Sequence, residues 1–139
     1  MVSSLDCSQS ALEYLTQKHK SLTSNEYKNE DDNYEECSRI ALKLAKLFLA
    51  EGLTPTITEI KGRRVDSDNE PIIPKIFDGR IIWKHHAVCT INTTVYDPIV
   101  GHPMPLDDYC REIFTKEVQA KIVVRPEYVS AWIQCYQGV

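Results

Sequence analysis

The strongest periodic pattern in the chain lies between residues 37 and 52, where apolar side chains recur at steps of three and four. The stripe and the residues that widen it are Ile40, Ala41, Leu42, Leu44, Ala45, Leu47, Phe48 and Leu49. This spacing predicts an α-helix with a broad apolar face, typical of a helix that other elements surround. Gly52 is the expected stop, because glycine readily adopts the left-handed conformation found after helix C-termini.

Two weaker features precede this helix. Residues 10–15 have helical spacing and predict a short N-terminal helix. Residues 24–36 are rich in Asn, Asp and Glu and almost free of aliphatic side chains, so we expect an acidic loop there. The N-terminal helix and the acidic loop, residues 1–36, therefore precede a core that covers residues 37–139.

After residue 52 the pattern changes to alternation and to runs of β-forming residues. The expected elements are strands at 56–61, 80–91 and 95–97, a helix at 106–114, a strand at 120–125, and a segment at 128–133 that fits a strand or a helix. Polar loops that contain prolines separate them at 62–79 and 98–105. Helices followed by strands indicate an α+β fold, in which the central helix packs on an antiparallel sheet.

The composition is that of a single globular domain over residues 1–139. Hydrophobic residues make up 42% of the chain and charged residues 26%, which argues against disorder of the whole chain. The net charge of −4 argues against a nucleic-acid partner, because such surfaces need clustered Lys and Arg. No apolar run approaches the roughly 20 residues that cross a bilayer, and no leader pattern opens the chain, so we expect a cytoplasmic protein.

The cysteines and histidines show no metal-binding pattern. The five cysteines, at positions 7, 37, 89, 110 and 135, form no Cys-x-x-Cys pair, and the four histidines have no ligand spacing. This arrangement argues against a zinc site and against a disulfide framework. No glycine-rich loop precedes a helix, so we expect neither a metal nor a nucleotide cofactor. The cysteines are interpreted as reduced, with at most one reactive thiol.

Cys37 is the candidate for that thiol, because it stands at the predicted start of the central helix. Unpaired N–H groups and the positive end of the helix dipole stabilise a thiolate at such a position. The acidic residues before it oppose this effect, so a protonated histidine nearby is needed to complete it. Taken alone, a cysteine at a helix start is more often structural.

A histidine and a carboxylate fall on the predicted hairpin. His85 and His86 lie on the strand at 80–91, and Asp97 lies on the strand that returns beside it. Asp97 can then hold one imidazole nitrogen while the other faces a thiol, which is the arrangement of an oriented general base. Strand neighbours point to opposite faces, so only one of the two histidines can serve. The alternative is a structural histidine and an Asp-Pro turn.

Three short stretches carry a resemblance to a known family: Cys37-Ser-Arg-Ile-Ala41, Trp83-Lys-His-His-Ala-Val88 and Val95-Tyr-Asp-Pro98. A helix-leading cysteine, a strand with an aromatic residue and a histidine, and a hydrophobic-Asp-Pro stretch follow in that order. This order resembles the papain-like fold, in particular the compact papain-fold toxin domains of bacterial polymorphic toxins. A Gly-Pro loop and a helix that begins near Tyr109 extend the likeness, which spans roughly residues 33–115.

The resemblance implies a cysteine-dependent hydrolase of protein amide bonds, either a peptidase or a glutamine deamidase. Cys37 would be the nucleophile and His86 the base, favoured over His85 by its His-Ala-Val context. Asp97 would orient His86, and Asn33 with the backbone N–H of Cys37 would form the oxyanion hole. The implied partners are a protein substrate and an immunity protein, with delivery into a target cell. A transglutaminase-type acyl transfer and a non-catalytic interaction module remain as alternatives.

Overall fold

The computed structural model describes residues 9–22, 30–62, 71–76 and 82–136, with the backbone alone for 30–35. Its elements, in chain order, are α2 (Gln9–Ser21), α3 (Glu30–Ala50), β1 (Thr56–Gly62), β2 (His85–Ile91), β3 (Thr94–Tyr96), β4 (Met104–Pro105), α4 (Leu106–Glu112), β5 (Val118–Val124) and α5 (Pro126–Cys135). Among the helices of this described part, none combines the length and apolar character needed to span a bilayer.

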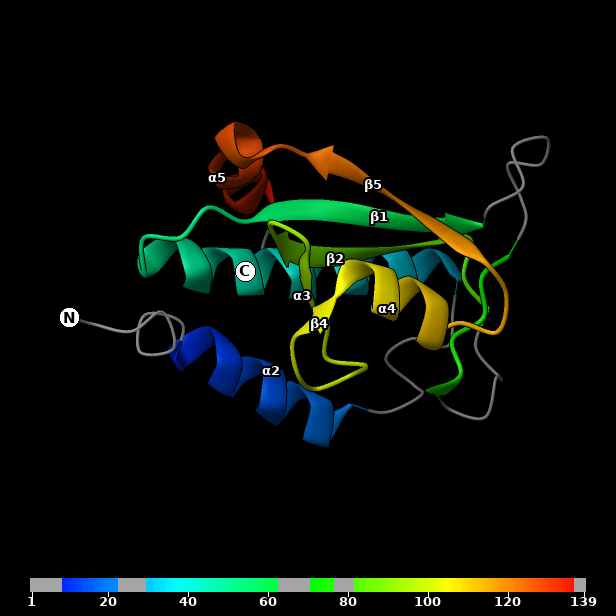
Figure 1. The fold of residues 1–139 in the computed structure, drawn as a ribbon. Helices are drawn as coiled ribbons and strands as arrows, with labels where there is room; N and C mark the ends of the chain where they lie inside the picture. The colour runs from blue at the N-terminus through cyan, green and yellow to red at the C-terminus, as the bar shows by residue number, and fades with distance from the viewer. Residues whose placement is uncertain (1–8, 23–29, 63–70, 77–81, 137–139) are drawn as a thin grey trace.

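The strands form one five-stranded sheet in the order β4-β3-β2-β1-β5, and every neighbouring pair is antiparallel. The register pairs Ile60 of β1 with His86 of β2 and Cys89 of β2 with Tyr96 of β3. The long strands β1 and β2 form the middle of the sheet, and α3 runs alongside them (Figure 1). The expected α+β fold with an antiparallel sheet is therefore confirmed.

The apolar stripe of α3 forms the centre of the core. Six of its residues are at most 4% exposed: Ile40, Ala41, Leu42, Leu44, Ala45 and Phe48. The helix contacts β2, β1, α2 and α5, so it is surrounded as its pattern predicts. It ends in a Schellman motif at Gly52, which has φ +84°. There Gly52 N–H donates to Leu49 O at 3.0 Å and Leu53 N–H to Phe48 O at 3.0 Å.

The start of α3 differs from the prediction. The helix begins at Glu30, so residues 30–36 are helical where an acidic loop was expected. Glutamate is a good helix former, and acidic residues are favoured in the first turn by the helix dipole. Polarity alone was therefore a poor indicator of a loop. Cys37 is consequently not at the helix tip but two turns inside the helix.

Two other expected elements, the strand at 80–91 and the segment at 128–133, take their observed form from backbone pairing and from a proline. Trp83 exchanges backbone hydrogen bonds with Ile72, at 2.8 and 2.9 Å, so this residue pairs outside the main sheet and β2 begins only at His85. The expected strand at 80–91 is therefore shorter, and residues 80 and 81 lie outside the described part of the chain. The segment at 128–133 is helical in α5, where Pro126 at the first turn favours a helix and Val129 is buried.

Candidate active site

The imidazole of His86 and the carboxylate of Asp97 meet across the β2–β3 hairpin. His86 Nε2 lies 2.8 Å from Asp97 Oδ2, and the two side chains are 0% and 3% exposed. His86 lies in the middle of the sheet, opposite Ile60 of β1. Asp97 directly follows β3, which is antiparallel to β2, so the turn at residues 92–93 returns the carboxylate to the histidine.

Three donors hold the Asp97 carboxylate. Oδ2 accepts hydrogen bonds from His86 and from the Tyr109 hydroxyl, which lies 2.5 Å away. Oδ1 accepts the backbone N–H of Ile99 at 3.1 Å, a local bond that aspartate often makes at a turn. These contacts replace the hydration that burial removes, which is the condition for keeping a carboxylate charged inside a protein.

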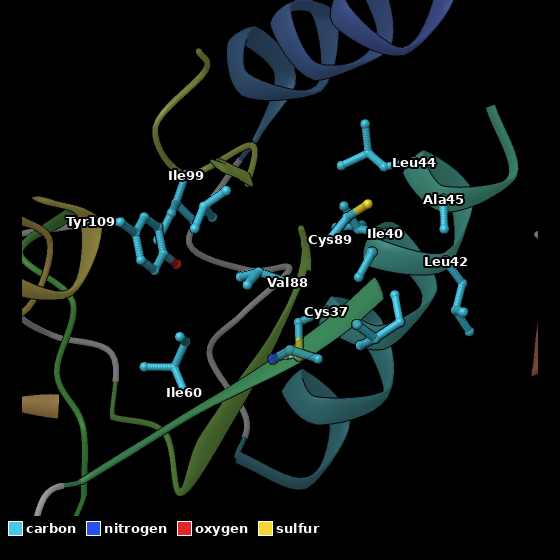
Figure 2. Packing of buried hydrophobic residues seen from close by; sticks show 14 of the residues in the cluster. Cys37, Ile40, Leu42, Leu44, Ala45, Ile60, Val88, Cys89, Ile99 and Tyr109 are labelled. Atoms are coloured by element: carbon cyan, nitrogen blue, oxygen red, sulfur yellow. Dashed lines mark hydrogen bonds between the residues drawn. The ribbon is translucent and has the colours of Figure 1, made fainter. Parts of the chain in front are cut away.

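Cys37 packs against β2 next to the histidine. Its Sγ accepts the backbone N–H of Ala87 at 3.3 Å, and the residue is 1% exposed. The pairing of β3 covers only residues 89–91 of β2, so Ala87 lies beyond the end of β3. Figure 2 shows Cys37 among the buried side chains of α3 and the sheet, near Ile40 and Val88. The sulfur thus has a backbone donor beside it.

His86 interacts with both Asp97 and Cys37, and these interactions govern its charge. Burial lowers the pKa of His86, but charge interactions with Asp97 and Cys37, together with the hydrogen bond to Asp97, raise it to about 10. Because Nε2 is bonded to Asp97, Nδ1 is the ring nitrogen that can serve Cys37. The geometry therefore favours an imidazolium between a carboxylate and a sulfur.

An aromatic cluster covers the histidine. The Trp83 indole stacks on the His86 ring, with centroids 4.1 Å apart and an interplanar angle of 10°. Phe114 meets Trp83 edge-on at 6.4 Å and Tyr109 edge-on at 5.6 Å. A flat ring stacked on an imidazolium gains cation–π energy and excludes water. Trp83 is fully buried and also touches the candidate base.

The structure brings together Cys37, His86 and Asp97. The predicted position of Cys37 at the N-terminus of the central helix, however, is wrong. As the eighth residue of α3, Cys37 is too far from the N-terminus to gain from unpaired N–H groups. Its own N–H lies where an intrahelical bond is expected, so it is not a ready oxyanion donor. The sulfur instead has the backbone N–H of Ala87 as its donor and lies in the same buried space as His86.

Two further positions were predicted for the site, His85 as the alternative base and Asn33 in the oxyanion hole. His85 pairs with Lys61 at the start of β2, whereas His86 is the histidine that is bonded to Asp97. Asn33 lies within α3, and its side chain falls outside the described residues. Sequence reasoning did not assign Tyr109 a site role, although the helix that begins near it was part of the family resemblance. An isolated tyrosine in a short helix gives no signal of its partner.

The group is closed to solvent. Its surroundings include Ile40, Ala41, Val88, Tyr96 and Pro98, and they leave no volume for a water molecule at the thiol. A larger cavity of about 540 Å³ lies elsewhere, between α4 and the start of β5. Cys37, His86 and Asp97 do not line this larger cavity, so its size does not bear on access to them. A substrate reaches Cys37 only if part of this cover moves.

Among the described residues, no cluster of three or more His, Cys, Asp or Glu side chains is placed to hold a metal ion. No family model, curated protein or solved structure matches the chain.

Proposed function

We propose that this protein is a cysteine-dependent hydrolase that acts on protein amide bonds, as a peptidase or a glutamine deamidase, with a papain-like arrangement of Cys37, His86 and Asp97. One observation carries the proposal: His86 is bonded to Asp97 through Nε2 and interacts with Cys37. Cys37, His86 and Asp97 thus have the arrangement of nucleophile, general base and orienting carboxylate that nucleophilic catalysis uses. These three residues come from separate elements of the chain. Their meeting in one place supports a catalytic site more strongly than a single cysteine would.

The chemistry follows from these contacts. The Cys37 thiolate attacks the amide carbonyl carbon, and the His86 imidazolium gives its proton to the departing nitrogen as the C–N bond breaks. The product is a thioester on Cys37 and a free amine, or ammonia in a deamidation. Neutral His86 then takes a proton from water, whose oxygen attacks the thioester. This step releases the carboxylic acid product and restores the thiolate–imidazolium pair.

The resemblance to polymorphic toxin domains supplies the partners of this proposal. A protein in a target cell would be the substrate, and an immunity protein would be the inhibitor. These partners rest on the short motifs at residues 37, 83–88 and 95–98 alone. A transglutaminase-type reaction would use the same thioester, with an amine in place of water.

A second candidate is a non-catalytic interaction module that keeps the same fold. The burial of Cys37, at 1% exposed and with no room for water at the sulfur, favours it. In this case the Cys37–His86–Asp97 group would stabilise the core only. The two candidates differ in one measurable property, the reactivity of the Cys37 thiol in the folded protein.

The test is alkylation by iodoacetamide at pH 6, with mass spectrometry to assign each modified cysteine. A free thiol with a pKa near 8.5 is almost entirely protonated at this pH and reacts slowly. Cys135 is exposed and provides the internal reference. The hydrolase predicts that Cys37 reacts at least about tenfold faster than Cys135, because its thiolate is already formed.

Matched variants give the control. His86→Gln removes the imidazolium and should abolish the fast reaction, whereas His85→Gln changes the neighbouring histidine and should preserve it. Cys37→Ala should remove the modified site and any hydrolysis of a protein substrate. If Cys37 reacts no faster than Cys135 between pH 5 and pH 8, the hydrolase proposal is overturned and the interaction module is supported.

A further inference from the structure

The hydroxyl of Tyr109 has no place in the proton transfers described above, yet it donates to the carboxylate that holds the candidate base. Tyr109 belongs to α4 and is fully buried. Its Oη lies 2.5 Å from Asp97 Oδ2, the same oxygen that accepts the hydrogen bond from His86. One oxygen therefore serves two donors from two different elements.

We propose that Tyr109 is a positioning residue for the proposed hydrolase: its hydroxyl fixes the Asp97 carboxylate against His86 and takes a share of the negative charge on Oδ2. This inference rests on the proposed function. Without Tyr109, the N–H of Ile99 holds only Oδ1, and the plane of the carboxylate would be less restricted. With Tyr109, both oxygens have fixed donors and Oδ2 stays directed at Nε2.

The hydroxyl reaches Asp97 because α4 is anchored next to the hairpin. The first residue of α4, Leu106, donates its N–H to Thr93 O at 2.8 Å, in the turn between β2 and β3. The Tyr109 ring packs edge-on against Phe114, which in turn meets Trp83. Backbone and aromatic contacts thus hold the phenol on both sides, and its hydroxyl has a fixed direction.

A hydrogen bond to Oδ2 also changes how strongly Asp97 attracts the imidazolium proton. The titratable side chains acting on His86 are Asp97 and Cys37, and Tyr109 acts on it through Asp97. Tyr96 is a further titratable group that lines the same space. If Tyr109 withdraws charge from Oδ2, removing its hydroxyl concentrates that charge on His86. The imidazolium should then hold its proton to a higher pH.

The experiment is an NMR titration of the His86 ring in the wild-type protein and in Tyr109→Phe, with His86→Gln to assign the signal. A hydrogen bond to an ionised carboxylate lowers the pKa of that carboxylate by about one unit, so its loss leaves a stronger charge facing a neighbouring imidazolium. We expect the His86 midpoint to rise by about one unit in Tyr109→Phe. In the Asp97→Asn background the same substitution should have no effect, because Tyr109 acts through the carboxylate.

Phe114→Leu is the packing control. It loosens the aromatic cluster around Tyr109 but keeps the hydroxyl, so it should lower stability and leave the His86 midpoint within a few tenths of a unit. If Tyr109→Phe does not fold, 4-aminophenylalanine at position 109 replaces it. Its amine is neutral at this pH and is a weaker donor than the phenol with nearly the same shape, so it should raise the His86 midpoint.

The outcomes separate the inference from the proposed function. An unchanged His86 midpoint in Tyr109→Phe, or an equal shift in Phe114→Leu, overturns the role of Tyr109 even if Cys37 is hyperreactive. An inert Cys37 in the wild-type protein overturns the hydrolase, whatever the titration shows. A shifted midpoint together with a fast Cys37 supports both.

Discussion

At the scale of single residues, the cost of burying charge explains the contacts around Asp97. A carboxylate that is 3% exposed loses nearly all of its hydration. Such a group is kept charged only when protein donors replace the water, and here His86, Tyr109 and Ile99 do so. Breaking one partner of such a buried pair is therefore expensive, which gives the first prediction.

Asp97→Asn should destabilise the protein by about 3 kcal/mol, the usual cost of removing one charge of a buried pair. Urea denaturation measures this change. The same variant should slow the alkylation of Cys37 at pH 6 by at least about tenfold, because His86 no longer retains its proton. Asp107→Asn, at an exposed position of α4, is the control and should change both quantities little. Equal effects of the two substitutions would contradict the role assigned to Asp97.

The second residue-scale prediction concerns pH. The pKa of His86 is raised from 6.5 to about 10 in the folded protein, so proton binding stabilises the fold fully below pH 6.5 and this contribution is lost as pH rises toward 10. The free energy of unfolding should therefore fall between pH 6.5 and pH 8, with a slope of up to about 1.4 kcal/mol per pH unit. Urea titrations at several pH values measure it.

The control for this pH effect is His86→Gln, in which the slope should vanish. An upper limit of pH 8 keeps out most of a second contribution, because burial raises the pKa of Cys89 and deprotonation of that thiol in the unfolded chain, around its usual pKa of about 8.5, also favours unfolding. A wild-type slope that persists in His86→Gln would show that another group is responsible.

At the scale of elements, the loop after β3 is held by the C-terminal turn of α2. His19 of α2 lies 2.6 Å from Pro98 O through Nδ1, and its ring lies against Gly101. Pro98 also lines the space around Cys37. The contact between α2 and the loop therefore determines how closely this side of the site is covered, and it requires a glycine at position 101.

Gly101→Ala should destabilise the fold more than Gly52→Ala. Both glycines have a positive φ, +86° and +84°, so both substitutions introduce backbone strain of about 1 kcal/mol. A Cβ at position 101 would also lie 2.6 Å from the His19 ring, whereas nothing lies within 4 Å at position 52. Thermal or urea denaturation of the two variants measures the difference.

His19→Ala added to Gly101→Ala separates the strain from the clash. We expect the double variant to recover the part of the loss that exceeds the Gly52→Ala value, because the ring is gone. If the two glycine variants are equally destabilised, the close packing of α2 on the loop is incorrect.

At the scale of the whole molecule, the question is how a closed site is opened. Cys37 and Cys89 are equally buried, at 1% and 0% exposed. Cys37, however, lies where several elements meet, in the same space that Pro98 of the loop lines. Cys89 lies within β2, paired with both β1 and β3. Local opening of the loop can therefore expose the first thiol, while the second requires disruption of the sheet.

Alkylation of the two thiols should consequently respond differently to urea. The rate for Cys89 should rise steeply with urea below the unfolding transition, with the slope of global unfolding, because a paired central strand opens only with the fold. The rate for Cys37 should be faster in water and depend weakly on urea. Parallel slopes for the two cysteines would mean that the site opens only on global unfolding, and would favour the interaction module.

Much of the fold could be predicted from the chain because the pattern is local. The stripe of α3, its stop at Gly52, the strand at 56–61 and the turn after residue 91 each depend on residues within a few positions of one another. The predictions were wrong where the structure depends on pairing between distant residues, or where polar residues fit both a loop and a helix. The start of α3 was placed seven residues late, and Trp83 pairs with Ile72 instead of continuing β2.

The candidate site shows the same division. Cys37, His86 and Asp97 could be named from residue type and order, since a hairpin brings the last two together. The sequence by itself could not place Tyr109 or Trp83 on the group, or show that the sulfur accepts the N–H of Ala87. These contacts join α3, α4 and the sheet, and their directions depend on packing between elements. Local patterns determined which residues are candidates for the site; only the tertiary structure decided what surrounds them, because burial and hydrogen-bond partners are properties of the assembled core.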